Sequence, residues 1–330
     1  MTGKCNTSLL LIILSLPIFL YLYPTAMKQV ISVLFLLFVC SLNAQAIYSR
    51  DYGNKENPPV IFIHGGPSGN ATLFEGTTAE ALSNKGFYVI VYDRRGEGRS
   101  KDDQATMTFK ESFDDLLNIY KLYGLNKANI LGHSFGGIIA TLFTNQYPQK
   151  VSSLTLAGAL FSQQETYDHI LKEAREKFKN DPSKLKQITD IEGLPKNSAE
   201  YRKSCYNIAG DMNFFSMPNP TPKSRQLRKE YEAGDFYKQN YRNPDSPLKF
   251  YKNESRNNLN NISVLKNIKK KDVPIFAVYG KNDAIFSEKQ INDLQTIVGK
   301  ENFDLIDNCS HYLFVDQQDE FLKFMVEHLH

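Results

Sequence analysis

The chain has 330 residues, of which 42% are hydrophobic and 23% are charged, and its formal net charge is +3 at pH 7. A chain of this length and composition can bury a sizeable core and form one large domain with an insertion, which excludes a disordered protein. The charge is close to neutral, and no basic run is interleaved with aromatic residues. Both features argue against nucleic acid as a partner.

The N-terminal segment 1–46 holds two apolar stretches, at 9–23 and 30–39. The second stretch has a basic start next to Met27 and a small-residue exit up to Ala46, which is typical of a secretory signal peptide. We therefore predict export to the periplasm or the medium. The alternative is an N-terminal membrane anchor and association with the membrane, although each stretch is shorter than the roughly 20 residues of a span.

After this segment, short apolar strands alternate with amphipathic helices. The alternation predicts an α/β fold with a mostly parallel central sheet and helices on both faces. We expect this core to comprise 47–160 and 262–330. The predicted strands are 59–63, 88–92, 127–131, 154–158, 273–279 and 303–306, and the clearest helix is 109–122.

The two parts of the core are separated by a polar segment, 161–261, which is rich in tyrosine and lysine and is interrupted by prolines at 217–222. We expect this segment to form an inserted, mainly helical lid (cap), because an insertion after a sheet strand would lie over the strand ends where α/β folds bind ligands. The alternative is a solvent-exposed insertion that does not contact the substrate. The expected lid helices are 164–179, 199–208 and 224–233.

The segment Gly132-His133-Ser134-Phe135-Gly136 places a Gly-x-Ser-x-Gly pattern between an apolar strand and an apolar helical run. In that setting the pattern is typical of a nucleophile elbow, a strained turn that exposes a serine hydroxyl. Its glycines are needed because side chains there would collide with the adjacent elements. Ser134 is therefore the predicted nucleophile, with an ordinary glycine-rich turn as the alternative.

In this architecture the nucleophile is followed along the chain by an acid and then by a histidine. Asp283 comes after the strand 273–279, and His311 comes after the strand 303–306, so we expect both on loops at the carboxyl edge of the sheet. Between them, Ser287 and Gln290 predict a capping box that opens a helix. The alternatives are Asp304 and Asp307 for the acid, and His64, His133, His169, His328 and His330 for the base.

Together these side chains predict acyl transfer. His311 would accept the hydroxyl proton of Ser134, while Asp283 would orient and stabilise the imidazole. The carbonyl oxygen that becomes negative needs backbone N–H donors. We expect these oxyanion-hole donors at Phe135, directly after the nucleophile, and at Gly66 in a glycine-rich loop.

No metal site and no cofactor is predicted. The chain after residue 46 keeps two cysteines, Cys205 and Cys309, and no Cys/His spacing in it is typical of metal ligands. One pair of cysteines does not define a disulfide framework, so the sequence leaves open whether they are bonded.

Three motifs resemble those of prolyl iminopeptidase-like α/β-hydrolases, which form peptidase family S33. The motifs are His64-Gly65-Gly66-Pro67, the segment 93–100 (DRRGEGRS) and the elbow at 132–137. The resemblance covers the core and not the lid. It implies a serine aminopeptidase that removes an N-terminal residue, often proline, from peptides without a metal or cofactor. It also implies that segment 93–100 is mainly a structural loop near the site.

The chain departs from this family where members bind the free amino group of the peptide. In some members a glutamate directly follows the acid of the triad, whereas Asp283 is followed by Ala284 here. Other members take this carboxylate from the lid. The candidates for substrate binding are therefore Glu192, Glu230, Glu232 and Glu254, each of which could equally be a solvated surface residue.

The favoured function is a proline-type aminopeptidase acting on small peptides. The alternative is a carboxylesterase or another acyl hydrolase of small esters, which the missing glutamate after Asp283 favours. A ligand-binding protein without turnover is disfavoured because the set of triad residues is complete. An epoxide hydrolase or a dehalogenase is also disfavoured, since those enzymes have an aspartate where Ser134 stands.

Overall fold

The computed structural model describes residues 47–329. Their sheet has seven strands in the order β1-β3-β2-β4-β5-β6-β7, in which β1 is antiparallel to β3 and all other neighbours are parallel. The prediction of a mostly parallel α/β sheet is confirmed. The strands are β1 (Ser49–Tyr52), β2 (Pro59–Ile63), β3 (Tyr88–Tyr92), β4 (Ala128–His133), β5 (Val151–Ala157), β6 (Ile275–Gly280) and β7 (Phe303–Ile306).

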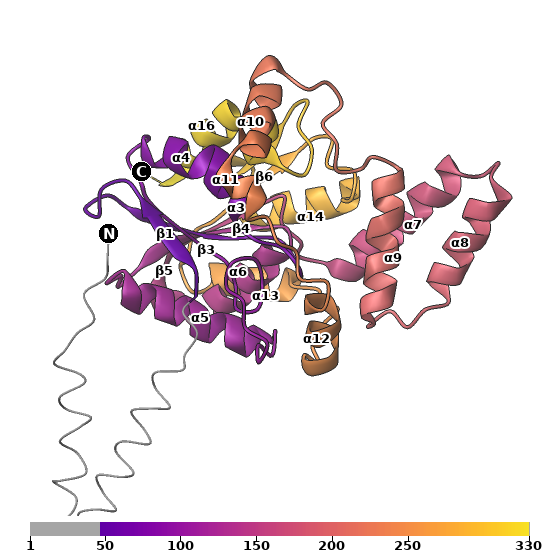
Figure 1. Cartoon of the computed structure of the whole chain (residues 1–330), viewed down its shortest axis with the longest axis horizontal. Coiled ribbons are helices and arrows are strands. Elements are labelled where there is room, and N and C mark those ends of the chain that lie inside the picture. Colours follow the sequence, from indigo (N-terminus) through magenta and orange to yellow (C-terminus); the bar gives the residue numbers. More distant parts are fainter. Residues whose placement is uncertain (1–46, 330) are drawn as a thin grey trace, which may run out of the picture. The chain divides into compact units, whose positions relative to one another are not determined.

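Each face of the sheet has its own apolar core, because successive side chains of a strand point to opposite faces. In β2, Ile61 and Ile63 belong to one core, and Val60 and Phe62 belong to the other. Figure 1 shows helices on both sides of the sheet, as the sequence predicts.

The helices outside the segment between β5 and β6 divide between these two cores. Those that contribute to the core around Ile61 are α5 (Phe109–Leu122), α6 (Phe135–Gln146), α13 (Ile262–Lys269) and α14 (Glu288–Val298). Those that contribute to the core around Val60 are α3 (Thr72–Phe74), α4 (Glu80–Ser83), α15 (Leu313–Asp316) and α16 (Gln318–Leu329), and a π-helical turn at Glu75–Ala79 joins α3 to α4. Two short 3-10 turns lie at Pro148–Lys150 and Lys300–Asn302.

The segment between β5 and β6 is mainly helical, and its two ends are joined at the core. Ser162 and Asn260 form an antiparallel bridge, and the Asn261 N–H donates to the Phe161 carbonyl over 2.7 Å. Figure 1 shows α7, α8 and α9 grouped at one end of the sheet. The helices of this segment are α7 (Gln163–Lys177), α8 (Pro182–Glu192), α9 (Ala199–Asp211), α10 (Pro222–Ala233), α11 (Asp235–Lys238) and α12 (Ser246–Asn253).

Several elements were not predicted from the sequence, and local chemistry explains two of them. β1 has only four residues, and at the sheet edge its Arg50 is exposed, so its apolar alternation is weak. α8 has few apolar positions, but the Asp181 side chain accepts from the Lys184 N–H and Pro182 occupies its first turn. Those two capping signals could have located the helix.

Within residues 47–329, no helix is both long enough and apolar enough to cross a membrane. The signal peptide or anchor expected over 1–46 lies outside the described residues, so export of the protein stays a prediction.

One buried carboxylate fastens the start of the described chain to the sheet. Glu75 is 3% exposed and accepts hydrogen bonds from the hydroxyls of Tyr48 and Tyr52, over 2.8 and 2.9 Å. It also pairs with Arg99 over 2.6 Å, and Arg99 bonds in turn to Asp93 over 2.7 Å. Glu75 therefore neutralises a largely buried guanidinium and satisfies two phenols at once.

We expect Glu75→Ala to lower the free energy of unfolding by on the order of 3 kcal/mol, because Arg99 and two hydroxyls lose their buried partner. Glu80→Ala is the matched control: Glu80 is exposed on the adjacent α4, and its loss should change stability by less than about 0.5 kcal/mol. Urea unfolding followed by circular dichroism measures both. Equal losses for the two variants would contradict a stabilising role for Glu75.

Candidate active site

Ser134 occupies the turn between β4 and α6. Its backbone has φ 53° and ψ −127°, a region that non-glycine residues rarely adopt, and α6 begins at the next residue. A side chain at Gly132 would come within 2.8 Å of the Ala140 Cβ, and one at Gly136 would overlap the carbonyl of Ile63. The strained strand-turn-helix that the sequence predicts at Ser134 is therefore present, and it requires both glycines.

Asp283 and His311 meet at the same edge of the sheet, on the loops after β6 and β7. The Nδ1 of His311 lies 2.8 Å from the Asp283 Oδ2, and both side chains are at most 5% exposed. Burial raises the pKa of Asp283, while the adjacent His311 opposes this rise. The carboxylate thus fixes the imidazole with Nδ1–H as donor, which leaves Nε2 to accept a proton.

Ser134 and His311 line one cavity of about 360 Å³. The described contacts include no hydrogen bond between these two side chains, and such bonds are often long before substrate binds. The cavity is walled on one side by the loop around Gly65 and on the other by lid residues, among them Arg202 and Phe215. Its volume is in the lower part of the roughly 300–1,000 Å³ range of small-molecule sites.

The loop His64–Pro67 passes directly beside the nucleophile. A side chain at Gly65 would lie 3.0 Å from the Ser134 Cβ, so any larger residue there would crowd the nucleophile. Neither the Gly66 N–H nor the Phe135 N–H donates a hydrogen bond in the loop, turn and cap contacts of residues 47–329. These contacts therefore leave both predicted oxyanion donors unused, and their assignment stays a prediction.

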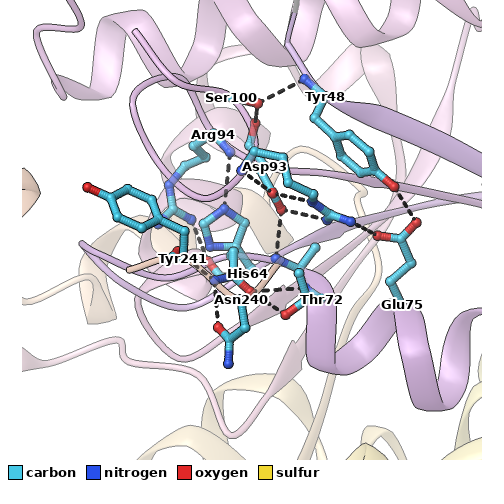
Figure 2. A network of polar contacts seen from close by, with 12 residues as sticks. Tyr48, His64, Thr72, Glu75, Asp93, Arg94, Ser100, Asn240 and Tyr241 are labelled. Carbon is cyan, nitrogen blue, oxygen red and sulfur yellow. Dashed lines mark hydrogen bonds and ion pairs between the residues drawn. The ribbon is translucent and has the colours of Figure 1, made fainter. Parts of the chain in front are cut away.

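The charged segment 93–100 holds this loop from behind (Figure 2). The Arg94 N–H donates to His64 Nε2 over 3.1 Å, and the Arg94 guanidinium donates to the carbonyl oxygens of His64 and Gly65. Glu97 pairs with Arg94 over 2.8 Å and accepts from the Ser68 N–H. Because these groups are buried, segment 93–100 positions the backbone of the loop His64–Pro67 and does not bind substrate. This is the structural role that the resemblance to the family implies.

The segment between β5 and β6, the expected lid, is hydrogen-bonded to the loops that carry Gly66 and His311. The Arg202 Nη2 donates to the Gly66 carbonyl over 2.5 Å. On the other side, the Ser310 hydroxyl next to His311 donates to the Phe215 carbonyl over 2.9 Å, and the Phe215 and His311 rings are 5.5 Å apart. These lid residues were missed in the sequence analysis because no motif marks them. In the polar, irregular sequence of the lid, the only available signal was the pattern that predicts helix α9.

His133, the residue before the nucleophile, supports the loop of the candidate base. Its Nε2 lies 2.9 Å from the backbone carbonyl oxygen of His311, and the two rings are 4.8 Å apart. Because a carbonyl only accepts, His133 carries its proton on Nε2. Burial, and then the neighbouring His311, lower the pKa of His133 to about 3. His133 is therefore a neutral positioning residue, a role that the sequence did not reveal.

This assignment predicts an acid-sensitive stability. Between about pH 6.5 and the depressed pKa of His133, the unfolded chain binds one proton more than the folded chain, so the free energy of unfolding falls as pH falls, by up to about 1.4 kcal/mol per pH unit. His133→Gln keeps a donor for the His311 carbonyl but does not titrate. The slope of unfolding free energy against pH should therefore be shallower in this variant. Parallel curves for the two proteins would contradict the buried, neutral state of His133.

Two of the alternative bases, His64 and His133, line the Ser134 cavity, but both are engaged in other contacts. Burial and the adjacent Arg94 hold the pKa of His64 well below its usual range, and both its ring nitrogens are used within the loop. Asp307 pairs with Lys281 on the surface. The other alternative bases and acids, His169, His328, Asp304 and Asp307, do not line the cavity.

Of the four candidate lid glutamates, Glu232 alone lines the Ser134 cavity. Glu192 is paired with Arg175, and Glu230 accepts from Gln226 on its own helix. Glu254 accepts from the Phe109 N–H over 3.1 Å at the start of α5. Glu232 is exposed and forms no ion pair with any of residues 47–329 within 4.0 Å. The structure thus brings one of the four to the site.

Residues 47–329 hold no cluster of three or more His, Cys, Asp or Glu side chains that could bind a metal ion. Cys205 and Cys309 are both buried and unbonded, and burial raises the pKa of Cys205 to about 12. These thiols therefore behave as inert core residues at neutral pH.

Comparison with known proteins agrees with this geometry. The model of the alpha/beta hydrolase fold family matches residues 58–318. A proline iminopeptidase of Saccharolobus solfataricus is 25% identical over an alignment of 316 positions, which covers 87% of this chain and 93% of that protein.

Two solved structures show the same fold. A proline iminopeptidase-related protein of Thermus thermophilus superposes with a TM-score of 0.62 at 22% identity, covering 85% of this chain and 92% of that one. A structure from a study of Nitrososphaera gargenis carboxylesterases superposes with a TM-score of 0.57 at 18% identity, covering 86% and 95%. Because the family match spans most of the chain and the sheet and the turn at Ser134 agree with it, this chain belongs to the α/β-hydrolase fold family.

Proposed function

We propose that the protein is a serine aminopeptidase that releases N-terminal residues, of the proline type, from small peptides. The observation that carries this proposal is a carboxylate, Glu232, in the wall of the cavity that holds Ser134 and His311, with no ion-pair partner among residues 47–329. A free α-amino group is a cation, and a carboxylate in the wall of the same cavity would anchor it. The likeness to a proline iminopeptidase along 87% of the chain supports the same activity.

The proposed reaction begins with Ser134. Its hydroxyl attacks the carbonyl of the N-terminal residue while His311 Nε2 takes the proton, and Asp283 stabilises the imidazolium that forms. The oxyanion is bound by the N–H groups of Gly66 and Phe135, each worth on the order of 3 kcal/mol in the barrier. His311 then protonates the departing amine. Water next attacks the acyl-enzyme while His311 takes its proton, and His311 returns that proton to the Ser134 oxygen as the product acid leaves.

The second candidate is a carboxylesterase. It is favoured by Ala284, which stands where some aminopeptidases of the family carry a glutamate, and by the fold shared with the carboxylesterase structure. Such an enzyme needs the same nucleophile, base and oxyanion donors but no anchor for an amino group.

Initial rates on proline p-nitroanilide and p-nitrophenyl acetate separate the two candidates. We expect release from the anilide that falls by at least about a thousandfold in Ser134→Ala, because the covalent step is lost. Folding of the variant is checked by circular dichroism. Ser134-dependent turnover of the ester alone would move the assignment to an esterase.

Glu232→Gln tests the amino-group anchor. We expect kcat/KM for proline p-nitroanilide to fall by about tenfold or more, since one charge-assisted contact is lost. The rate on p-nitrophenyl acetate, which has no amino group, should stay within about twofold of wild type. Glu230→Gln is the matched control, because Glu230 lies two residues away on α10 and outside the cavity wall. Equal effects of the two variants would remove Glu232 from this role.

A further inference from the structure

The Ser134 cavity has more positive than negative side chains. Its wall contains the guanidinium groups of Arg202, Arg228 and Arg242, and its only wall carboxylate among residues 47–329 is Glu232. An aminopeptidase site that bound only an ammonium group would be expected to carry an excess of carboxylates. The surplus of arginine therefore needs a separate explanation.

The three arginines differ in how far their charge is neutralised. Arg228 pairs with the buried Asp316 over 2.7 Å. Arg202 donates to the Gly66 carbonyl and lies over the Tyr206 ring, 4.9 Å from its centroid, and no described carboxylate lies within 4.0 Å of it. Arg242 is exposed and has no ion pair with any of residues 47–329. Two of the three guanidinium groups, those of Arg202 and Arg242, thus have no carboxylate partner among residues 47–329.

Arg242 lies on a segment that is fixed on both sides. Asn70 Nδ2 donates to the Asn240 side chain over 2.8 Å and to the Tyr241 carbonyl over 2.9 Å, contacts that tie this segment to the loop beyond Pro67 (Figure 2). On the other side, Asn243 Nδ2 donates to the Gly96 carbonyl over 2.9 Å. The backbone of Arg242 is therefore held at the cavity wall, which lowers the entropic cost of binding a ligand there.

We propose that Arg242, aided by the positive field of Arg202, binds the C-terminal carboxylate of a short peptide substrate. Guanidinium groups match carboxylates through paired N–H donors, and a cleft with a surplus of one charge concentrates ligands of the other. This inference rests on the proposed aminopeptidase function. It narrows the substrate class to di- and tripeptides that carry both a free amino group and a free carboxylate.

Binding to the Ser134→Ala protein separates recognition from turnover. Isothermal titration calorimetry is carried out with four peptides. Prolylglycine has a C-terminal carboxylate, and prolyl-aspartyl amide has its carboxylate on the side chain. Prolylglycinamide and prolylaspartic acid diamide have no carboxylate. We expect prolylglycine to bind about tenfold tighter than prolylglycinamide, with a preference that weakens as salt is added.

The double variant Ser134→Ala/Arg242→Gln should reduce the preference for prolylglycine over its amide to about twofold or less. Ser134→Ala/Arg256→Gln is the matched control and should keep the preference, since Arg256 is exposed and lies outside the cavity wall. Equal affinity for acid and amide, an unchanged preference in the Arg242 variant, or no binding of either peptide would overturn the proposal. Tighter binding of prolyl-aspartyl amide than of prolylglycine would also overturn it, in favour of a side-chain carboxylate.

Turnover of the same peptides by the protein with Ser134 intact reports on the proposed function alone. Carboxylate-selective binding without hydrolysis of prolylglycine would leave the Arg242 site in place and reject the aminopeptidase. Hydrolysis of prolylglycine and its amide at equal kcat/KM, with equal affinities, would support the aminopeptidase and reject the Arg242 site.

Discussion

The candidate site depends on one close approach of backbone to backbone. At Gly136 the first turn of α6 lies so near the end of β2 that a side chain there would overlap the carbonyl oxygens of Ile63 and His64. This contact places Ser134, at the head of α6, beside the loop that follows β2. The strained backbone of Ser134 and the nearness of Gly65 both follow from it. Ser134 and one predicted oxyanion donor, Gly66, come from separate parts of the chain, and the missing side chain at Gly136 lets those parts approach each other.

A second constraint keeps the same loop in place from the opposite side. Arg94 and Glu97 are buried, and their charges are satisfied by each other and by backbone groups of the loop after β2. A buried pair of this kind adds little net stability, because removing two charges from water costs about as much as their attraction returns. Its contribution is geometric: the loop has one arrangement in which all these donors and acceptors are paired. That arrangement leaves the Gly66 N–H unused.

The strands and helices of the core, and the chain order of Ser134, Asp283 and His311, could be predicted because they depend on local sequence patterns. The strands 59–63, 88–92 and 303–306 and the helix 109–122 have the predicted bounds, and the capping box of Ser287 and Gln290 is present. Apolar periodicity and glycine spacing are strong signals wherever a segment is buried on one or both faces. The structure also brings Asp283 to His311 as expected, since both follow parallel strands that end at one edge.

The lid was predictable only as a mainly helical insertion, because its function depends on contacts between segments far apart in the chain. Nothing near Glu232 distinguishes it from Glu230, yet the direction of α10 places one in the cavity wall and leaves the other on the surface. Arg202 likewise becomes part of the site only because α9 reaches the Gly66 carbonyl, more than a hundred residues earlier.

Contacts of the lid also reach the two loops that carry Gly66 and His311. Arg202 is bonded to the loop of one predicted oxyanion donor, and Phe215 contacts both His311 and the adjacent Ser310. A ligand that draws the Arg202 guanidinium toward its own carboxylate competes with the Gly66 carbonyl for the same donor. Binding of an anionic group would then act on the oxyanion loop directly, without any change in the core. Under the proposed function, substrate choice would therefore depend on residues 161–261, whose contacts the sequence predicts least, and would act through loops that its motifs predict well.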